Sequence, residues 1–223
     1  MKDLGKRKVF VGLVLAIMFA LFTYLVQIVD VKPLGVNGTG IGFSTLNCML
    51  HKVFGVNMML YTITDWAGLV PIFVAFSFGV LGLFQLIKRK SILKVDADIL
   101  VLGVYYIVVA TLYILFEMIP INYRPILING FMETSYPSST TLLVLGVMPT
   151  LAEQIGRRCK VALIKQMVSI LTVAFSAFMV VARTISGVHW VTDILGSVII
   201  SVGLFYIYKG FVLIFTEKKL IGG

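Results

Sequence analysis

Long apolar runs separated by short basic segments are the feature of this chain that most restricts its fold. Of its 223 residues, 59% are hydrophobic and only 13% are charged, a balance too apolar for a soluble domain of this length. A helix needs roughly 20 apolar residues to cross the hydrocarbon core of a bilayer. Runs that approach this length lie near residues 9–29, 66–87, 98–118, 138–156, 166–182 and 190–208. The pattern predicts an all-α, polytopic membrane protein with six transmembrane helices, in a single domain spanning residues 1–223.

Two of the runs carry features that bear on this count. The run near 138–156 contains Pro149, Glu153 and Gln154, and a proline is tolerated in a spanning helix where neighbouring helices satisfy the carbonyl that it frees. The run near 9–29 follows Lys-Arg-Lys, as the apolar core of a signal peptide would. It is longer than such a core and no small-residue cleavage pattern follows it, so we expect a retained anchor.

The basic residues predict how the helices are oriented. Of the 19 Lys and Arg, 15 fall on one side of the predicted membrane, so the positive-inside rule places both termini in the cytoplasm. The inner residues are Lys2, Lys6, Arg7, Lys8, Lys88, Arg89, Lys90, Lys94, Arg157, Arg158, Lys160, Lys165, Lys209, Lys218 and Lys219, and the outer ones are Lys32, Lys52, Arg124 and Arg183. The net charge of +9 does not indicate a nucleic-acid partner, because the basic residues do not line one solvated face with interleaved aromatic side chains.

The segment from Asp30 to Asp65 is glycine-rich and lies on the outer side in this topology. Within it, the stretch from Phe43 to Val56 is predicted to form a short helix at the membrane interface. Cys48 belongs to this outer segment, whereas Cys159 belongs to an inner one. The two cysteines therefore face different compartments and cannot pair with each other.

The stretch Ala182-Arg-Thr-Ile-Ser-Gly-Val-His-Trp-Val-Thr-Asp193 combines a fixed cation, a nucleophile or base, and a carboxylate that can orient it. His189 and Asp193 are spaced i and i+4, so on a helix they share one face, and the carboxylate can hold one imidazole nitrogen while the other faces a substrate. Arg183 offers a planar guanidinium group to phosphoryl oxygens. The set indicates a phosphate site, with His189 and Asp193 as candidate catalytic residues and Arg183 as a candidate substrate-binding residue.

Two further segments fall at the outer ends of neighbouring predicted helices. Arg124 precedes Pro125, which keeps the arginine backbone extended, although alone such a dipeptide is an ordinary turn element. The segment Tyr136-Pro-Ser-Ser-Thr-Thr141 opens the fourth run, where Ser and Thr side chains and free backbone N–H groups can bind an anion or simply cap the helix. Both segments converge with the Arg183 stretch on the outer side, which favours a shared anion site. The candidate substrate-binding residues here are Arg124, Ser138, Ser139 and Thr140.

On these residues the sequence resembles the type 2 phosphatidic acid phosphatase superfamily, a group of six-helix membrane enzymes that dephosphorylate lipid phosphates and polyprenyl diphosphates. The family pattern has three blocks, which read Lys-x6-Arg-Pro, Pro-Ser-Gly-His and Ser-Arg-x5-His-x3-Asp. The resemblance covers most of the chain in topology, and its specificity rests on the third block. The matching residues there are Arg183, Gly187, Val188, His189, Trp190 and Asp193.

The chain departs from the family pattern in all three blocks. Glu117 stands in the place of the first-block lysine, Ser139-Thr140 replaces Gly-His, and Ala182 replaces the third-block serine. The resemblance assigns protonation of the leaving group to the second-block histidine, and a threonine hydroxyl is not an acid near neutral pH. Glu117 or His51 is a candidate substitute acid, but we favour an ion pair between Glu117 and Arg124 that shapes the substrate site.

The surviving residues lead to a phosphatase hypothesis. His189 would attack phosphorus to form a phosphohistidine, Asp193 would fix its tautomer, and the two arginines would clamp the phosphoryl oxygens. Without a general acid an alkoxide would leave about 10²–10⁴-fold more slowly, whereas a diphosphate releases a phosphate that is stable as an anion. We therefore expect a multi-pass cell-membrane enzyme that acts on a lipid phosphate or diphosphate, such as a polyprenyl diphosphate, at the non-cytoplasmic face.

Two alternatives use the same residues. A family member that has lost catalytic groups would bind or move a lipid phosphate, and a phosphotransferase would pass the phosphoryl group to a second lipid. No cofactor is expected. The two histidines lie far apart and no carboxylate pair has ligand spacing, which favours a site that holds no metal.

Overall fold

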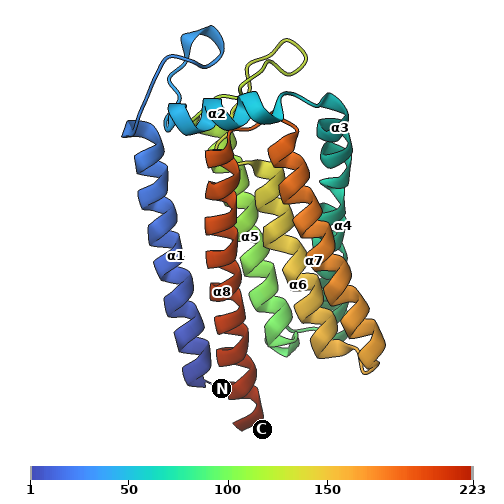
Figure 1. The fold of residues 1–223 in the computed structure, drawn as a ribbon. Helices are drawn as coiled ribbons and strands as arrows, with labels where there is room; N and C mark the ends of the chain where they lie inside the picture. The colour runs from blue at the N-terminus through green and yellow to red at the C-terminus, as the bar shows by residue number, and fades with distance from the viewer. Residues whose placement is uncertain (1, 222–223) are drawn as a thin grey trace.

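The computed structural model describes the backbone of residues 2–221 and the side chains of residues 2–216. The described chain is helical, which confirms the predicted all-α class. The helices are α1 (Lys2–Ile28), α2 (Ser44–Phe54), α3 (Met58–Ala67), α4 (Leu69–Arg89), α5 (Ala97–Met118), α6 (Ser139–Arg158), α7 (Ala162–Ile185) and α8 (Val191–Ile221), with short 3₁₀ helices η1 (Val36–Gly38) and η2 (Ile92–Lys94). Figure 1 shows the long helices running side by side, with the start of α1 and the end of α8 at the same end of the bundle.

Within the described residues, five helical stretches are long and apolar enough to cross a membrane, and they establish a multi-pass membrane protein. The second stretch, Met58–Arg89, begins earlier than predicted, because α3 continues through Gly68 into α4. The helix starts at Met58 since the side chain of Asn57 caps it, accepting the Leu60 N–H at 3.0 Å. The predicted outer loop up to Asp65 is therefore shorter than expected.

Helix α6 is the long helix that is less apolar than a typical span, and it lies at the centre of the bundle. It packs against α4, α5, α7 and α8, so its polar side chains meet protein rather than lipid. Gln154 donates to the Tyr208 hydroxyl at 2.7 Å, and the hydroxyl groups of Thr150 and Tyr106 lie 2.6 Å apart. Central position therefore explains the weak hydropathy of the fourth predicted span.

Helix α1 packs along α8 through glycines at matching positions. A Cβ atom built at Gly12 would lie 2.6 Å from the carbonyl oxygen of Gly203, and one at Gly210 would lie 2.7 Å from that of Gly5. On each helix the two glycines are seven residues apart, about two turns, so they share one face. Small residues at such a seam let two backbones approach closely in a membrane.

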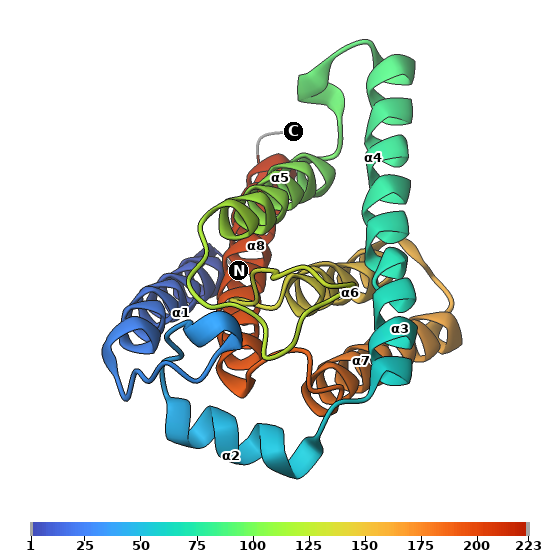
Figure 2. The ribbon, with the colours of Figure 1, turned by 90° about the horizontal axis from the view of Figure 1, so that it is seen from above.

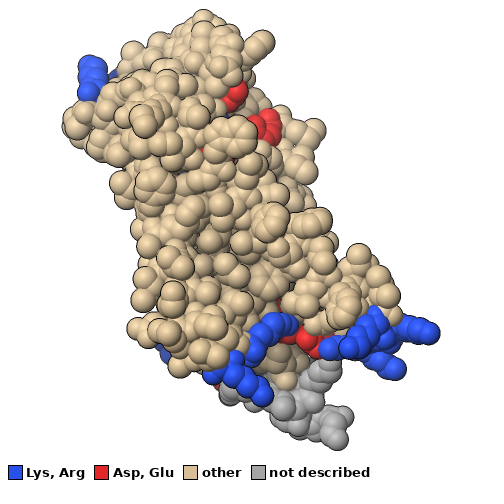
Figure 3. All heavy atoms as spheres, turned by 90° about the vertical axis from the view of Figure 1, so that its right-hand side faces the viewer, with Lys and Arg blue, Asp and Glu red and all other residues tan. Residues whose placement is uncertain are grey.

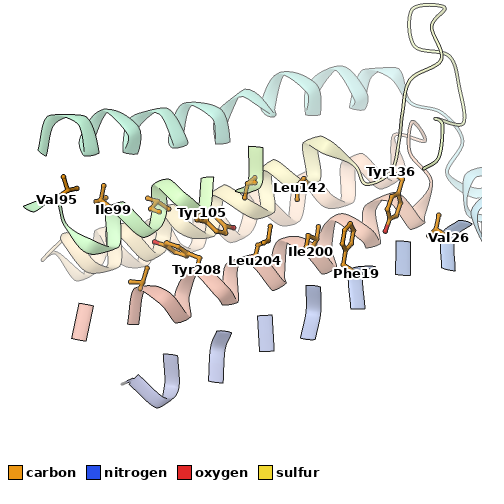
Figure 4. Close-up of a cluster of buried hydrophobic side chains, with 13 residues drawn as sticks. Phe19, Val26, Val95, Ile99, Tyr105, Tyr136, Leu142, Ile200, Leu204 and Tyr208 are labelled. Atoms are coloured by element: carbon orange, nitrogen blue, oxygen red, sulfur yellow. The ribbon is translucent and has the colours of Figure 1, made fainter. Parts of the chain in front are cut away.

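An apolar core between α1, α5, α6 and α8 fixes where α6 begins. Figure 4 shows Phe19 of α1 beside Tyr136, which lies just before α6. Their rings stack with centroids 6.1 Å apart, and the Tyr136 hydroxyl lies 2.8 Å from that of Thr23. Gly196 of α8 gives the Tyr136 ring room, since a Cβ there would lie 2.7 Å from it.

Helix α2 lies across the end of the bundle opposite the termini, and Figure 2 shows it leading from the α1 side to α3 and α7 (Figures 1 and 2). It corresponds to the helix predicted between Phe43 and Val56. Figure 3 shows a band free of Lys, Arg, Asp and Glu on the face in view, with charged residues at both ends. The side chains of Lys218 and Lys219, part of the inner basic set, lie outside the described residues.

Candidate active site

The loop from Ser186 to Trp190 joins α7 to α8 and carries His189. Gly187 turns the chain with a φ of +68°, and a Cβ there would overlap the carbonyl oxygen of Gly55, so only glycine fits. His189 therefore lies in the loop before α8, not on a helix face as its spacing predicted. Asp193 lies in the first turn of α8, where its carboxylate accepts the Trp190 N–H at 2.9 Å.

His189 and Asp193 nevertheless lie together, with His189 Nδ1 3.6 Å from Asp193 Oδ2 and both side chains almost fully buried. Within the described part of the chain, neither ring nitrogen of His189 has a hydrogen-bond partner. Burial, followed by the positive charges of Arg124 and Arg183, holds the pKa of His189 well below its ordinary value of 6.5. The imidazole is therefore neutral near neutral pH and keeps the lone pair that a nucleophile needs.

Arg183, in the last turn of α7, is 1% exposed and is fixed by two other helices. Its Nη2 donates to the Thr140 hydroxyl of α6 at 2.7 Å, and its Nη1 donates to the Thr64 hydroxyl of α3 at 3.2 Å. A carboxylate oxygen of Asp65 lies 3.8 Å from Nη2. These contacts hold the guanidinium group in one place without consuming its Nε, which lacks a hydrogen-bond partner among the described residues.

Arg124 lies in the loop between α5 and α6 and pairs with Glu133, not with Glu117. The loop folds back on itself, so that the Arg124 N–H donates to the Glu133 carbonyl at 3.0 Å and Arg124 Nε lies 3.0 Å from Glu133 Oε2. Glu117 instead accepts a hydrogen bond from the Thr134 hydroxyl at 2.9 Å. The expected Glu117–Arg124 ion pair is therefore wrong, because cross-loop backbone pairing sets the partner of Arg124.

The start of α6 meets the site through Thr140 and Ser138. Thr140, at the position of the family's acid histidine, accepts the hydrogen bond from Arg183. Ser138 donates its backbone N–H to the Asp193 carbonyl at 3.1 Å, and its hydroxyl lies 3.0 Å from that of Thr141. Ser138 thus ties α6 to α8, while Ser139, the first residue of α6, is half-buried.

Helix α2 and the α5–α6 loop brace the His189 loop from two sides. His51 Nε2 lies 3.0 Å from the Gly187 carbonyl oxygen, and the His51 ring lies 5.4 Å from the Trp190 ring between centroids. Trp190 Nε1 donates to the Tyr123 carbonyl at 2.8 Å. His51 therefore contacts the backbone of the loop, a role that its sequence position did not indicate.

Sequence reasoning assigned no role to α3, although three of its side chains contact Arg183. Tyr61, Thr64 and Asp65 are spaced i, i+3 and i+4, so they share one helical face. This spacing lies immediately before the second apolar run. It would predict that the three side chains share a face if the helix of that run were expected to begin before residue 66.

The comparisons with known proteins agree with this architecture. The PAP2 superfamily model matches residues 70–216, and the chain belongs to this superfamily. The fold is similar to the crystal structure of the first transmembrane PAP2 type phosphatidylglycerolphosphate phosphatase from Bacillus subtilis, with a TM-score of 0.58 and 19% identity over 94% of this chain and 97% of that one. No curated protein matched the sequence. The resemblance inferred from the three blocks is confirmed, and α2 and α3 precede the matched region.

Proposed function

We propose that this protein is a membrane lipid phosphatase that removes a phosphate from a lipid phosphate or diphosphate through a phosphohistidine at His189. The observation that carries the proposal is the burial of His189 near two buried guanidinium groups, those of Arg124 and Arg183, whose charges act with burial to lower its pKa. Membership of the PAP2 superfamily supports the reaction class.

The proposed reaction has two displacements at phosphorus. In the first, the Nε2 lone pair of His189 forms a bond to phosphorus while the bond to the leaving oxygen breaks, and Asp193 balances the charge that develops on the imidazole. In the second, water attacks phosphorus, the P–N bond breaks, and inorganic phosphate leaves with His189 neutral again. Arg124 and Arg183 donate to the phosphoryl oxygens, where negative charge is concentrated throughout.

The residue at the second-block acid position favours a diphosphate substrate. Thr140 accepts a hydrogen bond from Arg183 and has no proton acidic enough to assist an alkoxide. A leaving phosphate needs no such help, since its second ionisation lies near about pH 6 in comparable monoesters. We therefore propose a polyprenyl diphosphate as the preferred class of substrate, bound at the outer face of the cell membrane.

Phosphate release by the purified full-length protein in detergent tests the proposal. We expect release from a polyprenyl diphosphate at a higher rate than from phosphatidic acid, and a loss of at least about 10³-fold for His189→Ala. Thr111→Ala, at an exposed position of α5, is the control and should behave as wild type. Full activity of a folded His189→Ala protein would exclude His189 as the nucleophile.

The same assay separates the two alternatives. Radiolabelled phosphate trapped on His189 under alkaline quench, with turnover only when an acceptor lipid is added, would identify a phosphotransferase. Binding of the diphosphate without label and without release would identify a lipid-phosphate binder.

A further inference from the structure

One face of α3 makes a wall of the candidate site that the family blocks do not include. The Arg183 Cζ atom lies 5.1 Å from the centre of the Tyr61 ring, Thr64 accepts from Arg183 Nη1 at 3.2 Å, and Asp65 lies 3.8 Å from Nη2. The superfamily match begins at residue 70, after the end of α3 at Ala67. These contacts therefore belong to a part of this chain outside the matched region.

Tyr61 also contacts the second guanidinium group. The Cζ atom of Arg124 lies 5.8 Å from the centre of the same ring. Arg124 comes from the α5–α6 loop and Arg183 from the end of α7, so a single aromatic ring of α3 joins cations from two other segments. An aromatic face attracts a guanidinium group, and the attraction strengthens where water is excluded, as it is around Arg183 at 1% exposure.

Two arginines gathered for one anion repel each other before the anion arrives. Each charge is partly offset by a carboxylate, Asp65 for Arg183 and Glu133 for Arg124. A carboxylate supplies charge but permits several orientations, whereas a ring that both guanidinium groups contact restricts where their planes lie. The Tyr61 ring therefore reduces the cost of assembling the clamp in the free protein, which is preorganisation of the kind that active sites need.

The contacts leave donors available to a phosphoryl group. Thr64 and Thr140 occupy the two terminal nitrogens of Arg183, and Nε has no hydrogen-bond partner within residues 2–216. The same holds for Nη1 of Arg124. Buried donors of charged groups are costly to leave unpaired, which indicates that an anion completes them.

We propose that Tyr61 is a positioning residue whose ring holds the guanidinium groups of Arg124 and Arg183 at the spacing required by a phosphoryl group. Thr64 fixes the plane of the Arg183 guanidinium group. The role of Tyr61 in catalysis rests on the proposed function, but its role in holding the two arginines can be tested by anion binding, without turnover. Tyr61 acts through the arginines and contacts no reacting atom.

The experiment compares Tyr61→Phe, which keeps the ring, with Tyr61→Leu, which removes it. Orthovanadate binding to the purified full-length protein should be unchanged in Tyr61→Phe and about tenfold weaker or more in Tyr61→Leu, the effect of losing ring contacts to two buried cations. With a lipid diphosphate as substrate, Tyr61→Leu should raise KM by a similar factor, whereas Tyr61→Phe should have the KM of the wild type. Trp66→Leu, also on α3 but 71% exposed, is the matched control and should bind orthovanadate as wild type does.

Two outcomes would overturn the proposal. Equal weakening in the Phe and Leu variants would assign the effect to the hydroxyl, and unchanged binding in Tyr61→Leu would show that the arginines hold their spacing without the ring. If Tyr61→Leu fails to fold, Thr64→Val decides, because it removes the acceptor of Arg183 Nη1 with little change in volume and should also weaken orthovanadate binding. Normal hydrolysis by His189→Ala would reject the phosphohistidine mechanism without changing any of these binding results.

Discussion

The neutral state of His189 sets the expected pH dependence at the scale of single residues. Protonation would remove the attacking lone pair, and the pKa of His189 lies well below 6.5 because of burial and two neighbouring cations. The fall in kcat/KM at acid pH that results from protonation of His189 should therefore occur below pH 6.5. Between neutral pH and pH 6.5, kcat/KM should stay constant. A pH–rate profile of the purified protein measures this acid limb.

The cations provide the internal control for this prediction. Arg124→Gln removes one positive charge that lowers the pKa of His189, so the acid limb should move to higher pH even though the rate itself falls. A wild-type limb above pH 6.5, or a limb that moves to lower pH in Arg124→Gln, would contradict the assignment of His189 as the neutral nucleophile.

Thr140 offers a second prediction at this scale. Thr140→His would place an imidazole at the position where the family pattern has its acid, so the rate on a lipid phosphomonoester should rise relative to the rate on a diphosphate, by about 10²-fold at most. The ratio of the two rates in one preparation is the measurement. Thr140→Val, which has no proton to give, should lower both rates through Arg183. An unchanged ratio in a folded Thr140→His protein would mean that another group already supplies the proton.

The partners of the two arginines show what the sequence could and could not predict about the site. Arg183, His189 and Asp193 lie close together in the chain, and their spacing within one sequence block predicts that they form a site. The sequence does not indicate Glu133 as a partner of Arg124, because their contact depends on a loop that folds back and pairs residue 124 with residue 133. Contacts set by loop pairing leave no periodic trace in the sequence.

At the scale of elements, the close approach of the α2–α3 junction to the His189 loop predicts an asymmetry between two glycines. Gly187 and Gly55 both have positive φ values, +68° and +65°, and Gly55 has a ψ of −156°, so alanine strains the backbone at each position. A Cβ at Gly187 would overlap the Gly55 carbonyl, whereas one at Gly55 meets nothing within 4 Å. Gly187→Ala should therefore displace His189 and lower kcat/KM by about 10²-fold, while Gly55→Ala should mainly lower thermal stability.

Activity and melting temperature measured on both variants separate the two effects. Equal loss of kcat/KM in Gly187→Ala and Gly55→Ala would show that backbone strain, which the two share, matters more than the contact between the loops.

The helices differ in how well their hydrophobic patterns predict them. The lipid-facing spans were predicted near their observed positions, because a helix surrounded by lipid must be apolar on most of its surface. Helix α6 was the weakest of the six in hydropathy because its surroundings are other helices. Helix α3 was missed because its polar face turns toward Arg183, which breaks the apolar pattern while the helix continues.

At the scale of the whole molecule, the start of α1 and the end of α8 lie together and the candidate site lies at the opposite end, so the orientation in the membrane decides which leaflet supplies the substrate (Figure 1). The basic residues that gather toward the end with the termini favour a cytoplasmic location for that end. Cysteine labelling tests this orientation, since Cys48 of α2 and Cys159 just after α6 belong to opposite ends of the molecule.

In a protein with both native cysteines replaced by serine, Lys52→Cys on α2 and Lys160→Cys beyond α6 introduce thiols at exposed positions. A maleimide that cannot cross membranes should label Lys52→Cys in intact cells, and should label Lys160→Cys only after permeabilisation. The reason is the positive-inside distribution, which places 15 of the 19 Lys and Arg on one side and leaves Lys32, Lys52, Arg124 and Arg183 on the other. Labelling of Lys160→Cys alone in intact cells would show that the orientation is the reverse of the predicted one. His189 would then lie at the cytoplasmic face, and the lipid phosphate would have to come from the inner leaflet.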